Sequence, residues 1–420
     1  MVNYCNKMQN IEIILINITG ADRPGVTSAL TEILARHEAQ ILDIGQADIH
    51  HSLSLGIMFR TTPDRSGDIM KDLLFKCYEL NVKIRFSPVT IEDYEAWVSR
   101  QGKNRWIITI LGRQLTAKHI AMVTEEIARQ ELNIDGIQRL TGRMPLSADE
   151  EPRSKSCVEF SVRGNPISHS AMQHRFMQIS QQEEFDISLQ EDNVFRRCRR
   201  LICFDMDSTL IETEVIDELA VRAGVGDKVK AITESAMRGE IDFCESFKKR
   251  IALLEGLDES VLRDIAENLP ITEGVERMMQ VLKRTGYKTA ILSGGFTYFG
   301  NYLKQKFGFD YVYANELEIV DGKLTGRYIG DIVDGKRKAE LLRIIAQVEN
   351  INIAQTIAVG DGANDLPMLS TAGLGIAFHA KPKVKQTARQ SISTIGLDGV
   401  LYFLGFKDSF IGETPASNVE

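Results

Sequence analysis

Cysteine is scarce in this sequence, and its placement argues against the roles that cysteine usually has. Six cysteines are scattered over 420 residues, with no Cys-x-x-Cys pair and no regular spacing. A disulfide framework shows ordered spacings, and a cysteine-ligated zinc site contains closely spaced pairs. We therefore expect neither of these, and we expect a protein of the reducing cytoplasm.

Long apolar runs and an excess of positive charge are also missing. No run reaches the roughly 18 apolar residues that a membrane span requires, and the first ten residues, MVNYCNKMQN, lack the apolar centre of a signal peptide. The net charge is −8, from 50 basic and 58 acidic residues, which disfavours binding to a phosphate backbone. The one basic cluster, at 196–200, contains no interleaved aromatic residue. We expect neither a membrane nor a nucleic acid as a partner.

The first 190 residues show one pattern twice. Strand-like and helix-like segments follow each other in the order βαββαβ, which is typical of ferredoxin-like folds. The second copy begins with the strand-like run 105–112, and its fragment TEEIAR repeats the fragment TEILAR of the first copy. We predict two small modules, at 1–95 and 100–190, and a polar loop at 142–155 inside the second module.

From Leu201 the pattern changes to longer alternating segments. Helical stretches separate strands predicted at 201–205, 288–293, 309–314 and 356–360. This alternation is typical of a Rossmann-like, doubly wound α/β sheet with parallel strands. Segment 317–330 is predicted to be a hairpin that turns at Asp321-Gly322. We predict a third domain at 196–420, in which the almost entirely helical stretch 215–275 forms a cap.

Acidic, small and basic residues follow the strands of this sheet. The strand at 201–205 leads into Asp205 and Asp207, within the run FDMDSTLIETE. The runs ILSGG and GDGAND follow two later strands, and a helix begins near Lys336 and Lys338. Because the carboxyl ends of parallel strands converge on one crevice, we expect these side chains to meet.

Such a group of side chains is suited to phosphoryl transfer. Neighbouring carboxylates repel each other, and Asp205 and Asp361 can offset this repulsion by sharing Mg²⁺, which prefers oxygen ligands. Lys338 would add a second positive charge, and Ser293 with its neighbouring glycine N–H groups can donate to phosphate oxygens. Asp205 would then be the nucleophile, and Asp207 would serve as general acid and base.

The four motifs, in this order, resemble those of the haloacid dehalogenase superfamily and, within it, those of the phosphoserine phosphatases. The resemblance covers about 200–405 and implies an aspartyl-phosphate formed on Asp205. The magnesium ligands that it implies are Asp205, the backbone carbonyl of Asp207, and Asp361. The phosphate-binding residues that it implies are Ser293, Gly294, Lys338 and Asn364. Lys338 is preferred to Lys336 because the following run, AELLRII, aligns with the family in that register.

Residues of the predicted cap match the substrate site of the same family. Glu214 corresponds to the glutamate that receives the substrate ammonium, and Arg250 to the arginine that pairs with the substrate carboxylate. Met237 and Phe243 correspond to apolar residues that exclude water. An amino-acid head group carries one charge of each sign, so it requires one acid and one base at fixed positions. The substrate that the resemblance implies is O-phosphoserine.

The two front modules resemble ACT domains, small regulatory modules that often sense amino acids and pair between subunits. The run GADRPGV matches the first strand–helix turn of that family. Asp22, Arg23, Pro24 and Gly25 are therefore candidates for binding an amino-acid effector, such as serine or glycine. The second module has GRQLTAK at the corresponding place and is a candidate for packing alone. The resemblance also implies a homodimer.

We predict an enzyme, a Mg²⁺-dependent phosphatase that releases serine and phosphate from O-phosphoserine in the last step of serine synthesis. One alternative keeps the phosphatase but changes the substrate to another small phosphomonoester, such as homoserine phosphate, or transfers phosphate to an acceptor other than water. A second alternative is an amino-acid-sensing regulatory protein with a vestigial phosphatase half. A third is a dehalogenase that uses Asp205 on carbon, although the metal and phosphate pattern argues against it.

Overall fold

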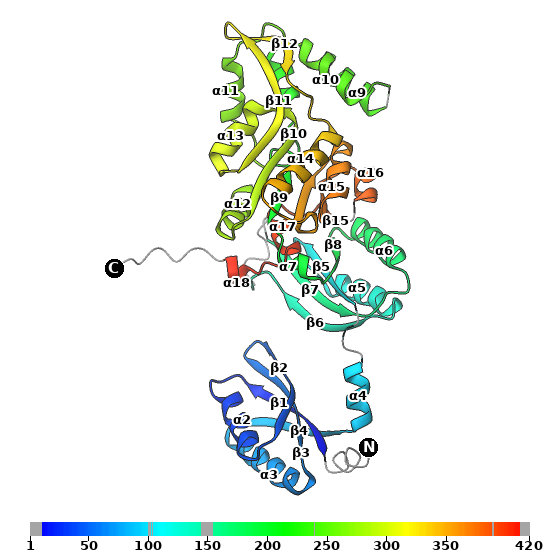
Figure 1. The fold of residues 1–420 in the computed structure, drawn as a ribbon, viewed down its shortest axis with the longest axis vertical. Coiled ribbons are helices and arrows are strands. Elements are labelled where there is room, and N and C mark those ends of the chain that lie inside the picture. Colours follow the sequence, from blue (N-terminus) through cyan, green and yellow to red (C-terminus); the bar gives the residue numbers. More distant parts are fainter. Residues whose placement is uncertain are drawn as a thin grey trace, which may run out of the picture. The chain divides into compact units, whose positions relative to one another are not determined.

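The structure is a computed structural model that divides into two compact units, one ending at residue 103 and one beginning at Asn104 (Figure 1). It describes residues 11–99, 102, 104–143, 154–238, 240–388 and 390–411, apart from the side chains of Asp48, Met237, Pro382, Lys383 and Gln386. The predicted loop at 142–155 therefore lies mostly outside the described residues. Each unit has hydrophobic cores of its own.

The first unit has the predicted βαββαβ order. Its elements are β1(Glu12–Ala21), α2(Val26–Arg36), β2(Gln40–Ile49), β3(Ser52–Thr61), α3(Pro63–Glu79), β4(Val82–Val89) and α4(Ile91–Ser99). The antiparallel sheet has the strand order β2-β3-β1-β4. Every second residue of β3 is buried, and α2 and α3 pack into one core with that face of the sheet. A strand of period two and two amphipathic helices therefore form one layered module.

The second unit begins with a module of the same topology. Its elements are β5(Arg105–Gly112), α5(Ala117–Arg129), β6(Asn133–Arg139), β7(Ser156–Arg163), α6(His169–Gln182) and β8(Asp186–Glu191). The strand order is β6-β7-β5-β8, in which each strand takes the place of its equivalent in the order β2-β3-β1-β4 of the first module. Thr116 caps α5 by accepting a hydrogen bond from the backbone N–H of His119. The repeat predicted from the sequence is confirmed.

A seven-stranded sheet follows, in the order β12-β11-β10-β9-β13-β14-β15. Its strands are β9(Leu201–Phe204), β10(Lys288–Phe296), β11(Tyr311–Val320), β12(Lys323–Ile329), β13(Thr356–Gly360), β14(Leu374–Phe378) and β15(Gln390–Ile392). All neighbouring pairs are parallel except β11 and β12, which form the predicted hairpin. Positive φ angles at Asp321 and Gly322 form its turn. The sequence did not predict β14 and β15.

Helices cover both faces of this sheet. Alternate residues of a strand point to opposite faces, so Ile202 and Phe204 join the core on one side and Leu201 and Cys203 the core on the other. The first core includes α12(Val275–Arg284) and α13(Thr297–Phe307), and the second includes α14(Gly335–Val348) and α15(Leu366–Thr371). The remaining short elements are α7(Val194–Arg197), η2(Ile353–Gln355), η3(Ala363–Asp365), α16(Pro382–Thr387), α17(Gly399–Phe403) and α18(Asp408–Ile411). The predicted doubly wound fold is confirmed.

Four helices form a cap between β9 and α12. They are α8(Val215–Arg222), α9(Gly226–Met237), α10(Phe243–Ala252) and α11(Ser260–Glu267). The two chain segments that lead into and out of the cap are paired. Glu212 N–H donates to the Pro270 carbonyl at 2.9 Å, and Thr272 N–H donates to the Leu210 carbonyl at 3.1 Å. We call residues 208–214 and 268–274 the cap hinge.

The second module is attached to the seven-stranded sheet by buried polar contacts. The Gln390 side chain of β15 donates to the Leu189 carbonyl at 2.6 Å and accepts from the Leu189 N–H at 3.1 Å. Asp186 accepts from the backbone N–H groups of Ser393 and Thr394 at 2.9 and 3.0 Å. Burial raises the pKa of Asp186, and these donors oppose that shift. The second module and the α/β domain are therefore parts of one unit.

The five described cysteines, Cys77, Cys157, Cys198, Cys203 and Cys244, are free thiols. Burial raises the pKa of the Cys77 thiol to about 11, so this thiol is protonated at neutral pH. Within the described ranges, no helix combines the length and the apolar character that a bilayer crossing requires.

Candidate functional site

Asp205 stands at the carboxyl end of the central strand of the large sheet. Its backbone N–H donates to the Val359 carbonyl of β13 at 2.9 Å, which continues the strand pairing by one residue. The residue is only 4% exposed, and its side-chain Oδ1 accepts from the Met206 N–H at 2.7 Å. A carboxylate buried in this way requires a positive partner.

Lys338 supplies that positive charge. Its side chain is fully buried, and Nζ lies 2.8 Å from Asp205 Oδ2 and 2.7 Å from Asp365 Oδ1. Burial alone would lower the pKa of this ammonium, but the two carboxylates outweigh burial and raise it. Asp334 begins the helix that carries Lys338 by accepting from the Arg337 N–H at 2.8 Å. Lys336, the other sequence candidate, is exposed.

Three carboxylates converge beside Lys338. One oxygen each of Asp205, Asp361 and Asp365 lie within 4.8 Å of one another. Burial, followed by the charge of Asp205, raises the pKa of Asp361 to about 8 and that of Asp365 to about 7. Hard oxygen donors that repel each other in this way fit a divalent cation of the Mg²⁺ type. Asp365 was not among the predicted ligands, although its spacing of four residues from Asp361 was a usable signal.

Asp207 lies next to this group of carboxylates, and a backbone N–H donates to one of its side-chain oxygens. Oδ1 accepts from the Val215 N–H at 3.2 Å, and a Cβ added at Gly295 would lie 2.5 Å from Oδ2. Only glycine therefore leaves room for the carboxyl group at this position. Burial, then Glu214 and Asp205, raise the pKa of Asp207 well above its usual value. This carboxyl group can hold a proton at neutral pH.

The last residues of β10 pair irregularly with β11, and an asparagine of β11 fixes their shape. Ser293 is fully buried, and its Oγ accepts from the Gly295 N–H at 2.9 Å. Asn315 donates to the Gly294 carbonyl at 2.8 Å and accepts from the Val333 N–H at 2.8 Å. Sequence reasoning missed Asn315. The signal for it was a polar residue within the strand-like run YVYANELEI.

Asn364 lies at the start of the short helix that follows β13. It is partly buried, and its carbonyl lies so close to Gly335 that a Cβ added there would meet the oxygen at 2.3 Å. The loop after β13 thus packs directly on the first turn of the helix that carries Lys338. This contact between Asn364 and Gly335 fixes the positions of Asn364, Asp365 and Lys338 relative to one another.

The cap reaches the strand ends through Phe243. A Cβ added at Gly294 would lie 2.9 Å from Phe243 Cζ, so the ring rests on the glycine. Phe243 also stacks on Phe247, with ring centroids 6.3 Å apart. The Met237 side chain, which the sequence placed beside it, lies outside the described residues.

Glu214 and Arg250 face this space from the cap and its hinge. Glu214 precedes the first cap helix and accepts from Ser208 Oγ at 3.1 Å. Although its side chain reaches solvent, desolvation by the surrounding protein and then Asp205 raise its pKa. Burial lowers the pKa of Arg250, and Glu214, Asp217 and Asp207 oppose that shift. Among the described residues, the buried Arg250 Nε has no hydrogen-bond partner.

Two curated proteins resemble this chain over nearly its whole length. The phosphoserine phosphatase SerB2 of Mycobacterium tuberculosis is 39% identical over 396 residues, which cover 93% of each chain. The phosphoserine phosphatase of Streptomyces coelicolor is 38% identical over 403 residues, which cover 95% of this chain and 94% of that one. The chain belongs to the phosphoserine phosphatase family.

Family models and solved structures agree with membership in the phosphoserine phosphatase family. Residues 12–87 and 105–190 match models of the ACT domain, and residues 199–373 match the haloacid dehalogenase-like hydrolase model. A probable phosphoserine phosphatase from Vibrio cholerae is similar in structure, with a TM-score of 0.56 and 35% identity over 72% of this chain and 86% of that one. A haloacid dehalogenase family hydrolase from Salmonella enterica has a TM-score of 0.62 and 30% identity, covering 71% and 98%. This family member is therefore a hydrolase with two ACT domains.

The predicted effector turn of this phosphatase family member lies in the first ACT domain. Asp22, Arg23, Pro24 and Gly25 are all exposed and connect β1 to α2. Gly25 has a φ of 94°, a left-handed value that favours glycine, and occupies the N-cap of the helix. The Asp22 N–H donates to the His51 carbonyl at 2.8 Å. The turn has a structural role, and effector binding there stays a prediction.

Proposed function

We propose that this chain hydrolyses O-phosphoserine to serine and phosphate, the last step of serine synthesis. The observation that carries the proposal is the unpartnered, buried Nε of Arg250 in the cap, which interacts electrostatically with Glu214 of the cap hinge. These two residues offer one charge of each sign beside the carboxylates and lysine at the strand ends. The charges suit the ammonium and the carboxylate of an amino acid whose phosphate lies against Ser293 and Lys338.

In the first step, Asp205 attacks phosphorus. A bond forms between an Asp205 carboxylate oxygen and phosphorus as the bond from phosphorus to the serine oxygen breaks. Asp207 donates its proton to the leaving serine oxygen, a role for which its raised pKa is suited. Lys338 offsets charge on the phosphoryl oxygens, and Ser293 with the backbone N–H groups at the end of β10 donates to them.

In the second step, Asp207 takes a proton from water, whose oxygen attacks the phosphorus of the aspartyl-phosphate. The bond between phosphorus and Asp205 breaks, which releases phosphate and restores the carboxylate. Phe243 and Met237 would keep bulk water from the site until serine has left. The contact between Phe243 and Gly294 supports this role for the phenylalanine, because it brings the cap onto the end of β10, where the phosphate would bind.

The residues that would hold Mg²⁺ are Asp205, Asp361 and the backbone carbonyl of Asp207, with Asp365 beside them. The fit rests on the donor set, because the three carboxylates are all oxygen ligands and lie close enough to share one ion. Bound there, Mg²⁺ would neutralise charge on the transferred phosphoryl group.

The experiment is a steady-state assay of phosphate release with a panel of phosphomonoesters. The panel contains phosphoserine, homoserine phosphate and phenyl phosphate, each with Mg²⁺ and with a chelator. We expect Mg²⁺-dependent release and a kcat/KM for phosphoserine at least tenfold above those of the others. A preference for homoserine phosphate would overturn the substrate, release of a phosphorylated alcohol in place of phosphate would overturn hydrolysis, and no turnover at all would support a vestigial site.

Regulation by an amino acid and assembly as a homodimer complete the proposal. The exposed turn at Asp22–Gly25 supports an effector such as serine or glycine in the first ACT domain. Exposed apolar side chains on α3, at Leu74, Phe75 and Tyr78, support pairing of two chains. Kinetics with added serine and glycine, and light scattering for the subunit number, test these two points. The free thiols are consistent with a cytoplasmic location.

A further inference from the structure

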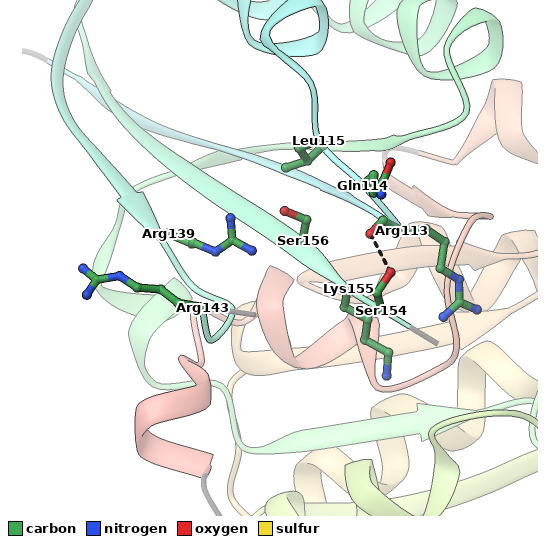
Figure 2. A pocket seen from close by; sticks show the side chains of 8 residues that line it. All are labelled: Arg113, Gln114, Leu115, Arg139, Arg143, Ser154, Lys155 and Ser156. Carbon is green, nitrogen blue, oxygen red and sulfur yellow. Dashed lines mark hydrogen bonds between the residues drawn. The ribbon is translucent and has the colours of Figure 1, made fainter. Parts of the chain in front are cut away.

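A cavity of about 380 Å³ lies in the second ACT domain, at the end of β5 (Figure 2). Its volume is in the range of small-molecule sites. The residues that matter for its chemistry are Arg113, Arg139, Arg143, Lys155, Ser154 and Ser156. Figure 2 shows Arg139 and Arg143 on one side of Ser156 and Arg113 and Lys155 on the other. Among the described residues that line the cavity, four are cationic and none is acidic.

Two of the four cations are neutralised by carboxylates of the α/β domain. Arg113 forms a bidentate pair with Glu273, with Nη1–Oε1 and Nη2–Oε2 distances of 3.0 and 2.7 Å. Lys155 pairs with the fully buried Asp398, which also accepts from Arg277 at 2.7 Å. These contacts hold the rim of the cavity against the α/β domain.

The other two cations have no acidic partner in the part of the chain that the structure describes. Arg139 donates through Nε to the carbonyls of Thr141 and Gly142, each at 3.3 Å, and its remaining donors have no carboxylate acceptor. Arg143 is exposed and forms no ion pair with a described residue. Nearby, Asp408 is occupied by Arg277 at 2.7 Å. Among the residues that the structure describes, these two positive charges at the cavity have no carboxylate partner.

We propose that this cavity is a regulatory binding site for a small organic dianion of the phosphate-monoester or dicarboxylate class. The guanidinium groups of Arg139 and Arg143, which pair with no described carboxylate, match two negative charges, and their planar forks suit the oxygens of phosphate or carboxylate. The hydroxyl of Ser156 adds a polar group, and Leu115 lines a smaller apolar part. The corresponding turn of the first domain carries one acid and one base, Asp22 and Arg23, so we expect the two ACT domains to differ in the ligands that they bind.

The cavity also adjoins the cap hinge. Glu273, the partner of Arg113, directly follows Thr272, whose N–H donates to the Leu210 carbonyl of the other hinge segment. A dianion that draws Arg113 away from Glu273 would loosen the point at which the chain leaves the cap. The site is thereby placed to change cap opening and, with it, KM. The proposal does not depend on which phosphomonoester the active site accepts.

The test is calorimetric titration of the full chain, without Mg²⁺, with inorganic phosphate, glycerol phosphate and succinate. We compare three proteins: the unmodified chain, the double variant Arg139→Gln/Arg143→Gln, and the control variant Arg105→Gln. Arg105 is an exposed arginine at the opposite end of β5. We expect one more binding equivalent per chain in the unmodified protein and the control than in the double variant. Equal stoichiometry and affinity in all three would overturn the site, whatever the outcome of the phosphatase assay.

A single variant gives a second test that does not depend on correct folding of the double variant. Arg143→Glu reverses the charge of an exposed side chain and should leave the fold unchanged, while it weakens binding of the dianion at least tenfold. Unaltered binding to this variant would contradict the proposal. The three probes separate the sources of the anion. Binding of glycerol phosphate alone indicates a phosphate monoester, binding of succinate alone a dicarboxylate, and binding of inorganic phosphate alone excludes an organic ligand. Binding of none overturns the proposal.

Discussion

The buried ammonium of Lys338 lies 2.8 Å from the carboxylate of Asp205, although 132 positions separate these residues in the chain. The second carboxylate on Lys338, that of Asp365, lies at 2.7 Å. The helix start after β12 and the loops after β9 and β13 thus meet at one charged centre. Each prediction below changes one part of this centre or of the cap that covers it.

Replacing Lys338 should abolish most of the activity. Lys338→Met leaves two buried carboxylates unpaired, and we expect kcat to fall roughly 100-fold or more. Because removing one partner of a buried ion pair costs about 3–5 kcal/mol, the free energy of unfolding should also fall. Lys336→Met, which changes an exposed lysine on the same helix, should leave kcat within about twofold. Steady-state kinetics and urea unfolding check both variants, and the opposite ranking would show that the wrong lysine was assigned.

Replacing Arg250 should impair recognition of the amino acid and leave phosphoryl transfer itself intact. Arg250→Ala removes the group that we propose to hydrogen-bond the substrate carboxylate, so kcat/KM for phosphoserine should fall roughly 10- to 100-fold. Phenyl phosphate lacks that carboxylate, and its kcat/KM should change by less than about threefold. Lys249→Ala serves as the matched control, because Lys249 is an exposed neighbour that pairs with Glu245 at 2.7 Å. Equal losses on both substrates would assign Arg250 a structural role.

Adding one methyl group at Gly295 should displace Asp207, the proposed general acid. The new Cβ would lie 2.5 Å from Asp207 Oδ2 and 2.8 Å from Met206 Cε. A shift of about 1 Å at a reacting group can lower the rate roughly 100-fold, and we expect a loss of that size in kcat. Gly136→Ala, on a strand where a Cβ meets nothing within 4 Å, should leave kcat unchanged. Full activity of Gly295→Ala would show that Asp207 is not held in this position.

Magnesium affinity should depend on pH through Asp361. Burial, Asp205 and Asp365 raise the pKa of Asp361 to about 8, so below that pH Mg²⁺ must displace a proton. We expect the affinity to fall by up to about tenfold for each pH unit below 8. By the same linkage, the metal-free protein should lose stability as the pH rises from about 4 to about 8, because over this range Asp361 is ionised in the unfolded chain and protonated in the folded one. Calorimetry in buffers of different ionisation enthalpy measures the released proton, and a pH-independent affinity would contradict this assignment.

The sequence predicted the layout of the fold because its patterns are local. The repeated βαββαβ order, the central strand before Asp205 and the hairpin at Asp321-Gly322 all depend on residues close together in the chain. The strands β14 and β15 were missed because they are short and lie among glycine, alanine and polar residues. Their burial depends on neighbours far away in the sequence, which periodicity alone does not reveal.

At the site, the motifs indicated which segments would meet but not every residue that holds them together. Asp205, Asp361 and Lys338 were predicted from strand-end loops, and the structure brings them together. Asn315, whose side chain joins the end of β10 to the segment after β12, carries no motif of its own. The ion pair between Arg113 and Glu273 joins two domains, and no local pattern could indicate it.

The most direct measurement is to trap the phosphorylated protein. Phosphoserine with a labelled phosphate is mixed with the protein and Mg²⁺, and the reaction is quenched in acid within one turnover. The protein is then digested for peptide mapping. The label should appear on the peptide that contains Asp205, decline when unlabelled substrate is added before the quench, and be absent from Asp205→Asn. Undiminished turnover by Asp205→Asn, or a label on a peptide without Asp205, would contradict capture of the phosphoryl group by this carboxylate.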